Sequence, residues 1–434
     1  MNKTWIIFTM LLIAVASAYA QDQLTLEDAR LITLENNFGI KIAENNVKIS
    51  QNLTDKKLNN YLPTLSANGG VNGSFGGSAQ QFNNGSEANT NNALTLGANA
   101  SLNADYTIYD KRRSLTLEQL EQSVLLSDIQ LRQTVEQSLF QVYISYYTVA
   151  QLTENIEALE NTIEISESRR QRAKYELDLG RGNGLAVLNA QVDIQRDSIN
   201  LINALTALDI EKRNLNTAMG RDSDTPFDLI TDTELNEVLE LENILQNYKS
   251  NNTALQINEQ NQIINSMDLD LIEVENKPII VAGAAYNLSL QDNPSQAFIT
   301  SSNSRGFTGN IGINWPIYDA SRDIRKQNVA IALTNQKLQK EQLQQEIERD
   351  LINGWTNYNN ALKVVTVEQY ALSINEENFN RTKELFNAGQ VNSIEFRQAQ
   401  LNLLTAKTNL NNAIYNVHLS EIQLKLLSGT LLSL

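Results

Sequence analysis

Strict alternation of apolar and polar residues marks three stretches of the chain as β-strands with one apolar face. Between Leu94 and Ile108 every even-numbered residue is apolar, aromatic or small, and every odd-numbered residue is polar or glycine. Successive side chains on a strand point to opposite faces, so such a strand has one apolar face and one polar face. Residues 64–75 and 307–318 alternate in the same way, and 279–290 is expected as a fourth strand. The pattern predicts β-hairpins at 64–108 and 279–318, with the Gly-, Asn- and Ser-rich residues 76–93 as a loop.

After each hairpin the apolar residues recur every three or four positions, the spacing of one stripe on a helix. No Pro or Gly interrupts the chain between Lys111 and Gly180, so a helix is predicted over 111–179. At about 1.5 Å per residue it would span on the order of 100 Å. A shorter helix is expected over 185–219, and a matching pair over 320–388 and 392–427. Residues 24–62 also have a helical pattern.

The order of these elements occurs twice, and specific residues recur with it. The spacing is 215 residues before the second hairpin and 209 residues after it, and a change inside a surface loop explains the difference. The matched pairs include Asn36-Asn37 with Asn251-Asn252, Pro63 with Pro278, Gly180 with Gly389, and Gly220 with Gly429. The matches predict a duplication, with a first repeat over 21–225 and a second over 226–434.

The first twenty residues have the pattern of a secretory signal peptide. Lys3 precedes an apolar centre, and Ala18-Tyr19-Ala20 forms a small-x-small cleavage site, so 1–20 is expected to be removed. A retained anchor is the alternative reading. The chain has no cysteine, which excludes disulfides. Its formal charge of −16 argues against nucleic acid, because phosphates require neutralisation by Lys and Arg.

Four amphipathic strands in one chain suggest a membrane pore built from several chains. Spanning strands need about 9 to 11 residues, and only a closed barrel satisfies every backbone group in lipid. Known barrels start at about eight strands, and eight leave an interior filled by side chains. Three chains would give twelve strands and room for water. A soluble sheet sandwich is the alternative, but its solvated face would usually carry Lys and Glu. Aromatic residues at or near the predicted strand ends would form the interfacial girdle: Tyr106, Tyr109, Tyr286, Trp315 and Tyr318.

The chain resembles the TolC family of outer-membrane efflux channels over essentially its whole mature length. The likeness rests on the repeated plan, on Ile-Tyr-Asp at 108–110 and 317–319, and on the helix-turn-helix tips beginning at Gly180 and Gly389. The resemblance implies a mainly α fold with a β-barrel part: a homotrimeric twelve-stranded transmembrane β-barrel continued by a periplasmic α-helical barrel. It implies a passive conduit in the cell outer membrane, with a large periplasmic portion, for efflux or export of small molecules or proteins.

The resemblance also implies partners and candidate sites. The partners are outer-membrane lipid, a periplasmic adaptor protein and an inner-membrane pump of the RND, ABC or MFS type. The periplasmic aperture would be lined by Glu395, Gln398, Asn392 and Phe386. The tips that dock the adaptor would present Gly180, Asn183, Leu185, Gly389, Asn392 and Ile394. Glu395 as an ordinary solvated helix residue is an equally open reading.

Other conspicuous residues favour structural interpretations. The basic run at 169–174 fits a solvated helix face better than adaptor docking. The glycines at 180–184 join two helices instead of following a strand, which argues against a phosphate loop. His418 has no cysteine or paired carboxylate nearby in sequence. We therefore expect no enzyme activity, no cofactor and no metal site. The main rival function is a non-channel periplasmic or surface coiled-coil scaffold.

Overall fold

The structure is a computed structural model that describes residues 22–230, 239–293 and 299–433. The predicted signal peptide at 1–20 lies outside these residues. The chain forms two compact units. Unit 1 contains the described residues up to Asn45, Asp128–Ile257 and those from Lys340 onward, and unit 2 contains Asn46–Ser127 and Asn258–Gln339.

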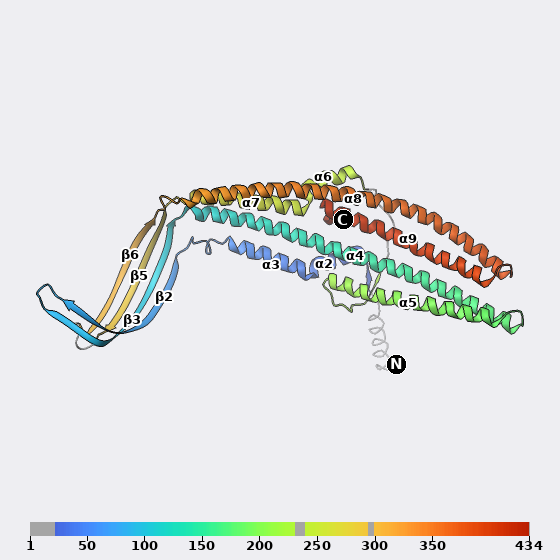
Figure 1. The fold of residues 1–434 in the computed structure, drawn as a ribbon, viewed down its shortest axis with the longest axis horizontal. Coiled ribbons are helices and arrows are strands. Elements are labelled where there is room, and N and C mark those ends of the chain that lie inside the picture. Colours follow the sequence, from blue (N-terminus) through green and yellow to red (C-terminus); the bar gives the residue numbers. More distant parts are fainter. Residues whose placement is uncertain (1–21, 231–238, 294–298, 434) are drawn as a thin grey trace, which may run out of the picture. The chain divides into compact units, whose positions relative to one another are not determined.

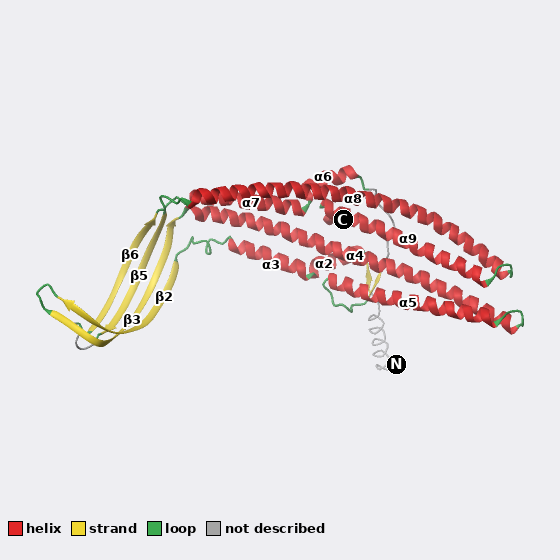
Figure 2. Ribbon diagram, in the orientation of Figure 1, coloured by secondary structure: helices red, strands yellow, loops and turns green. Residues whose placement is uncertain are grey.

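The chain is mainly helical, and its longest strands lie in unit 2 (Figures 1 and 2). In chain order the elements are β1 (Asp22–Leu24), α2 (Leu26–Asn36), α3 (Phe38–Leu53), β2 (Thr64–Gln81), β3 (Glu87–Tyr109), α4 (Lys111–Asp178), α5 (Gly184–Ala218), β4 (Phe227–Leu229), α6 (Leu241–Asn251), α7 (Thr253–Val274), β5 (Ile279–Asp292), β6 (Ser301–Asn314), α8 (Ser321–Asn387), α9 (Ser393–Ser428) and η2 (Leu431–Ser433).

Unit 2 contains a four-stranded antiparallel sheet in the order β2-β3-β5-β6 (Figure 1). The register places Leu102 of β3 level with Ala67 of β2 and Tyr286 of β5, which in turn is level with Phe307 of β6. Because level residues share a face, the apolar positions of all four strands lie on one side of the sheet. Within the sheet, β2 and β6 are the edge strands.

Three sequence expectations for the sheet were wrong. The last strand is Ser301–Asn314 rather than 307–318, because Pro316 has no N–H to donate to a partner strand. The expected loop at 76–93 is mostly strand, and β2 and β3 pair as far as Gln81 and Glu87. Tyr286 lies in the middle of β5, not at its end. Hydrogen bonding between the backbones of β2 and β3 continues from the pairs that precede it, so the Gly-, Asn- and Ser-rich residues did not end these strands.

On the polar face of the sheet, glycines make room for asparagine side chains from the next strand. A Cβ at Gly97 would lie 2.7 Å from Oδ1 of Asn72, and one at Gly283 would lie 2.6 Å from Oδ1 of Asn310. Real Cβ atoms are not found so close, so these positions need glycine. The packing explains why glycines interrupt otherwise regular strands.

Unit 1 has two main apolar cores. In the first, Leu139, Val142 and Tyr143 of α4 pack with Leu24 of β1 and Phe227 of β4. In the second, Ile244 and Tyr248 of α6 pack with α8 and α9, where the buried residues are Ile347, Leu351, Tyr358, Val365, Ala413, Val417 and Leu424. The short elements β1, β4 and α6 therefore cover the long helices, and β4, which belongs to the second repeat, packs on α4 of the first.

Residues matched by the repeat form the same joint in both halves, in which an asparagine between two short helices hydrogen-bonds to the end of a later helix. Helix α2 ends at Asn36, so the predicted single helix over 24–62 is broken, and α3 itself ends at Leu53. The Asn37 side chain accepts from Ile40 N–H and donates to the Ala218 carbonyl at 2.8 Å. In the second half Asn252 accepts from Leu255 N–H and donates to the Leu427 carbonyl, also at 2.8 Å.

A glycine completes each of these joints. Gly220 has φ of 76°, and a Cβ there would lie 2.5 Å from the Asn36 carbonyl oxygen. Gly429 has φ of 72°, and its Cβ would lie 2.3 Å from the Asn251 carbonyl oxygen. At both positions a side chain is disfavoured by the left-handed backbone conformation, and its Cβ would also collide with the neighbouring carbonyl oxygen.

Candidate functional site at the helix tips

Two helix-turn-helix tips lie in unit 1: a first tip between α4 and α5 and a second tip between α8 and α9 (Figure 1). Each turns through a glycine in the left-handed conformation, Gly180 or Gly389, with φ of 72° at both. In the first tip Arg181 N–H donates to the Glu176 carbonyl, and in the second Gln390 N–H donates to the Leu385 carbonyl, both at 2.9 Å. These bonds satisfy carbonyls that the helix end would leave unpaired.

Asparagine begins the helix after each tip. The Asn183 side chain accepts from Ala186 N–H at 3.0 Å, and the Asn392 side chain accepts from Ile394 and Glu395 N–H. Glu395 completes a capping box, because its Oε2 accepts from Asn392 N–H at 3.1 Å. Of the four proposed aperture residues, Asn392 and Glu395 thus contact each other, and the Gln398 side chain donates to Asn402.

Apolar side chains project from both tips. Leu185 is 62% exposed and Ile394 is 75% exposed. Large apolar side chains are exposed singly on most proteins, but here they occupy matching places in two tips. The proposed docking residues therefore comprise two turn glycines, two capping asparagines and two exposed apolar side chains.

Phe386, the fourth proposed aperture residue, is held in an aromatic cluster. Its ring stacks on Phe396 at 4.7 Å between centroids, and Phe396 lies 5.6 Å from Phe379. The Arg172 guanidinium lies over the Phe386 ring at 4.7 Å and donates to Asn387. These contacts connect α4 to the end of α8 just before the second tip.

A buried ionic cluster, which we call the tip network, joins α9 to α4 and α5. Arg397 donates two hydrogen bonds to the Asp197 carboxylate, at 2.6 and 2.8 Å, and its Nε lies 3.8 Å from Asp193. Arg169 of α4 pairs with the same Asp193. The side chains of Arg397 and Asp197 are 9% and 2% exposed.

Neutral groups complete the tip network. Ser166 donates to Asp197 at 3.0 Å, while the Gln400 amide donates to Ser166 and to the Thr162 carbonyl. Buried charges are stable only when paired and hydrogen-bonded, and here two arginines face two aspartates. Sequence reasoning missed this cluster.

The basic run at 169–174 differs from the expected solvated face. Arg169 is buried in the tip network, and Arg172 contacts the end of α8. Arg170 is solvated. Its hydrogen bond to Glu167 lowers the pKa of the Glu167 carboxyl. His418 is buried, and its ring stacks on Tyr147 at 4.6 Å.

Comparison with known proteins decides the family. The sequence profile described as outer membrane efflux protein matches residues 32–221 and 244–430, most of the chain. The chain belongs to the outer membrane efflux protein family. No curated protein matches its sequence.

Solved channels share the fold of this outer membrane efflux protein. The TM-score is 0.73 with CmeC of Campylobacter jejuni, at 13% identity over 94% of this chain and 86% of that chain. It is 0.70 with the open state of MtrE of Neisseria gonorrhoeae, at 16% identity over 94% and 89%. It is also 0.70 with CusC, at 17% identity over 93% and 92%.

Family membership makes this protein an outer-membrane efflux channel with a large periplasmic portion, and it does not favour the scaffold alternative. The family comprises channel proteins rather than enzymes. Among the described residues, no helix has an apolar stretch long enough to cross a bilayer. No group of three or more potential metal ligands lies together in that same part of the chain.

Proposed function

We propose that three copies of the chain assemble into one efflux conduit, with a twelve-stranded barrel in the outer membrane and a helical tunnel in the periplasm. The observation that best supports this assembly is the sheet in unit 2. It has an apolar face shared by four strands, and its edge strands β2 and β6 have no partner on their outer sides among the described residues. Lipid accepts an apolar face but not an open edge, so the edges of separate copies would pair.

The aromatic residues fit this arrangement in part. Tyr106 and Tyr109 are among the last residues of strand β3, just before α4. Trp315 and Tyr318 follow strand β6. All four side chains are exposed, as the lipid-facing residues of a barrel are. Tyr286 would instead contact lipid near the middle of the apolar band.

The helices favour the same assembly, because two of them expose apolar stripes. In unit 1, α5 exposes Leu185, Leu188, Val192, Ile199 and Ile202, at coiled-coil spacing. In unit 2, α8 exposes Ile324, Ile331 and Leu338, seven residues apart. Each stripe would be buried against a helix of a neighbouring copy.

The tips would serve docking and closure. Leu185 and Ile394 offer apolar contacts to a periplasmic adaptor protein, which would connect the conduit to an inner-membrane pump of the RND, ABC or MFS type. Gly180, Asn183, Gly389 and Asn392 would hold the two turns in shape. Three copies of Glu395 would bring negative charge to the aperture, beside Asn392 and Gln398, while Phe386 would support the second tip through its ring contacts.

Planar-bilayer recording of the purified protein tests this proposal. We expect discrete openings, and cation block that weakens in Glu395→Gln, which retains an acceptor for the cap but removes the charge. Equal block in the wild type and in Glu395→Gln would remove Glu395 from the aperture. An inert oligomer that never conducts would refute the conduit and favour a scaffold.

A further inference from the structure

One face of α9 carries only uncharged polar side chains along most of the helix. We call this face the amide stripe. Its residues follow helical spacing and are all exposed: Gln398, Asn402, Thr405, Asn409, Asn416 and Gln423. A solvated helix face usually carries Lys and Glu, and this chain has a formal charge of −16. A neutral stripe of this length is therefore a local exception.

The other faces of α9 are occupied within unit 1. Ala413, Val417 and Leu424 pack in the apolar core with α6 and α8. Arg397 and Gln400 bind α5 and α4 through the tip network, and further along the Asn412 side chain accepts from Gln151 of α4 at 2.8 Å. The amide stripe is the face that remains.

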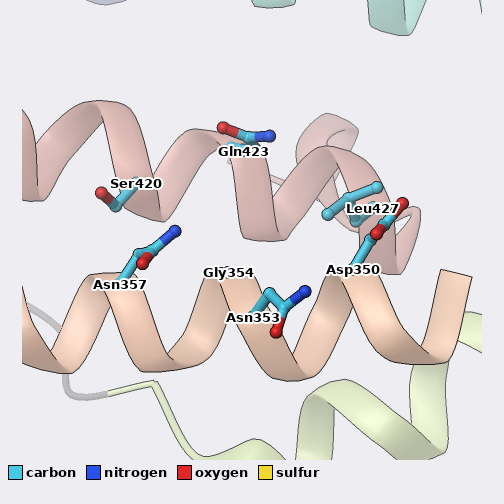
Figure 3. Close-up of a pocket in the computed structure, with 7 residues that line it drawn as sticks. All are labelled: Asp350, Asn353, Gly354, Asn357, Ser420, Gln423 and Leu427. Carbon is cyan, nitrogen blue, oxygen red and sulfur yellow. The ribbon is translucent and has the colours of Figure 1, made fainter.

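The neutral surface continues across a groove between α8 and α9 (Figure 3). The groove has a volume of about 200 Å³, and Asn353, Asn357, Ser420 and Gln423 line it. Its acidic member, Asp350, is paired with Arg349 at 2.7 Å. A second groove of about 300 Å³ shares three of these residues and adds two polar ones, Asn360 and Asn416, and four apolar ones, Ala361, Val364, Ala413 and Leu419.

The packing of α6 indicates which way this surface faces. Helix α6 is an extra layer on the apolar face of α8 and α9, formed by Leu351, Tyr358 and Val417. The amide-stripe residues are exposed and none of them belongs to this core, while the grooves border it at Ala361, Ala413 and Leu427. A tunnel that enclosed α6 of every copy would leave less room for water, so placing α6 outside favours a wide tunnel and would turn the amide stripe toward the interior.

Unit 2, taken by itself, has a polar sheet face of the same character. Its members are Asn68, Asn72, Asn99, Asn103, Asn287 and Asn310, on the side opposite the apolar residues. Asp105 is a charged residue on this face. Amide groups donate and accept hydrogen bonds without attracting either sign of ion.

We propose that the amide stripe lines the lumen and gives the tunnel a wall that selects little by charge, so that its substrates are hydrogen-bonding solutes of either charge or none. This inference rests on the proposed conduit. A wall of carboxylates would concentrate cations within about a Debye length of 8–10 Å, whereas amides do not. Specificity would then come from the partners that load the tunnel.

Single cysteines test the placement, because the chain has none of its own. Asn409→Cys and Asn416→Cys place a thiol on the amide stripe, and Asn247→Cys places one on the exposed side of α6 as a matched control. Assembled channels would be recorded in planar bilayers before and after a sulfonate-bearing methanethiosulfonate is added, with labelling confirmed by mass spectrometry.

We expect a lower current at positions 409 and 416 and no change at 247. In Glu395→Gln, which lacks the proposed aperture charge, we expect a reversal potential near zero in a KCl gradient. Labelled positions 409 and 416 with unchanged current would overturn the lumen placement while leaving the conduit intact. Strong cation selectivity that persists in Glu395→Gln would overturn the neutral wall. The absence of any channel current would refute the conduit itself, and the inference with it.

Discussion

Removing Arg397 should loosen the second tip strongly, because Asp197 would be left buried without its partner. Arg397 makes two hydrogen bonds to the Asp197 carboxylate, which is 2% exposed. Breaking a buried ion pair by deleting one member costs about 3–5 kcal/mol. The variant Arg397→Met retains the length of the side chain but removes the charge and both hydrogen bonds.

Amide hydrogen exchange measures this loss where it occurs. At about 1.4 kcal/mol per factor of ten, exchange in the first turns of α9 should become roughly two to four orders of magnitude faster. The matched control is Arg381→Met, which breaks an exposed i,i+4 pair with Glu377 on α8. Such pairs contribute about 0–1 kcal/mol, so exchange there should change less than about fivefold.

A second variant separates an unpaired charge from lost packing. Combining Arg397→Met with Asp197→Leu removes both charges, and a buried pair replaced by apolar residues is often neutral in stability. We expect the double variant to recover most of the protection lost in Arg397→Met. If Arg397→Met exchanges no faster than Arg381→Met, the tip network does not hold α9 in place.

Three further predictions concern stability. Gly429→Ala would place a Cβ 2.3 Å from a backbone oxygen of α6, whereas a Cβ at Gly389 meets nothing within 4 Å. Gly429→Ala should therefore lower the melting temperature, followed by circular dichroism, clearly more than Gly389→Ala. Hydrogen bonds from Ser321 lower the pKa of Asp319 from 3.8 to about 2, so its stabilising effect is complete above about pH 4 and is lost as the pH falls through 2. In Asp319→Asn the loss of stability between pH 4 and pH 2, measured by denaturant unfolding, should be smaller. Burial raises the pKa of Glu136, so the stability that its protonated carboxyl contributes is lost as the pH rises through this raised pKa. Glu136→Gln should abolish that loss of stability in the same assay.

The sequence predicted the helices and strands well where the apolar residues follow the regular spacing of a helix or a strand. Alternation at 94–108 predicted the core of β3, and uninterrupted helical spacing predicted α4 to within one residue at its end. The strand ends were predicted less well, because pairing with a neighbour sets them. Pro316 ended β6 early, and the polar residues of β2 and β3 remained paired.

The tip network was missed because its members lie far apart in sequence. Asp197 and Arg397 are 200 residues apart, and each alone has the appearance of a surface residue. One signal was present. Asp197 lies seven residues after the buried Ala190, on the same coiled-coil position, and Arg397 follows the buried Phe396. Charged residues at buried positions on two helices suggest that they pair.

Edge pairing between copies is the central claim, and disulfide formation tests it most directly. Asn68→Cys on β2 would be combined in turn with Thr308→Cys, Asn310→Cys and Gly312→Cys on β6, and the membranes oxidised. Within one chain, β3 and β5 separate these strands, so a bond inside a copy would have to bridge three strand spacings of about 4.8 Å each. At least one pair should give a covalent ring of three chains on a denaturing gel. If all three pairs remain monomeric after complete oxidation, the barrel is not built from separate copies.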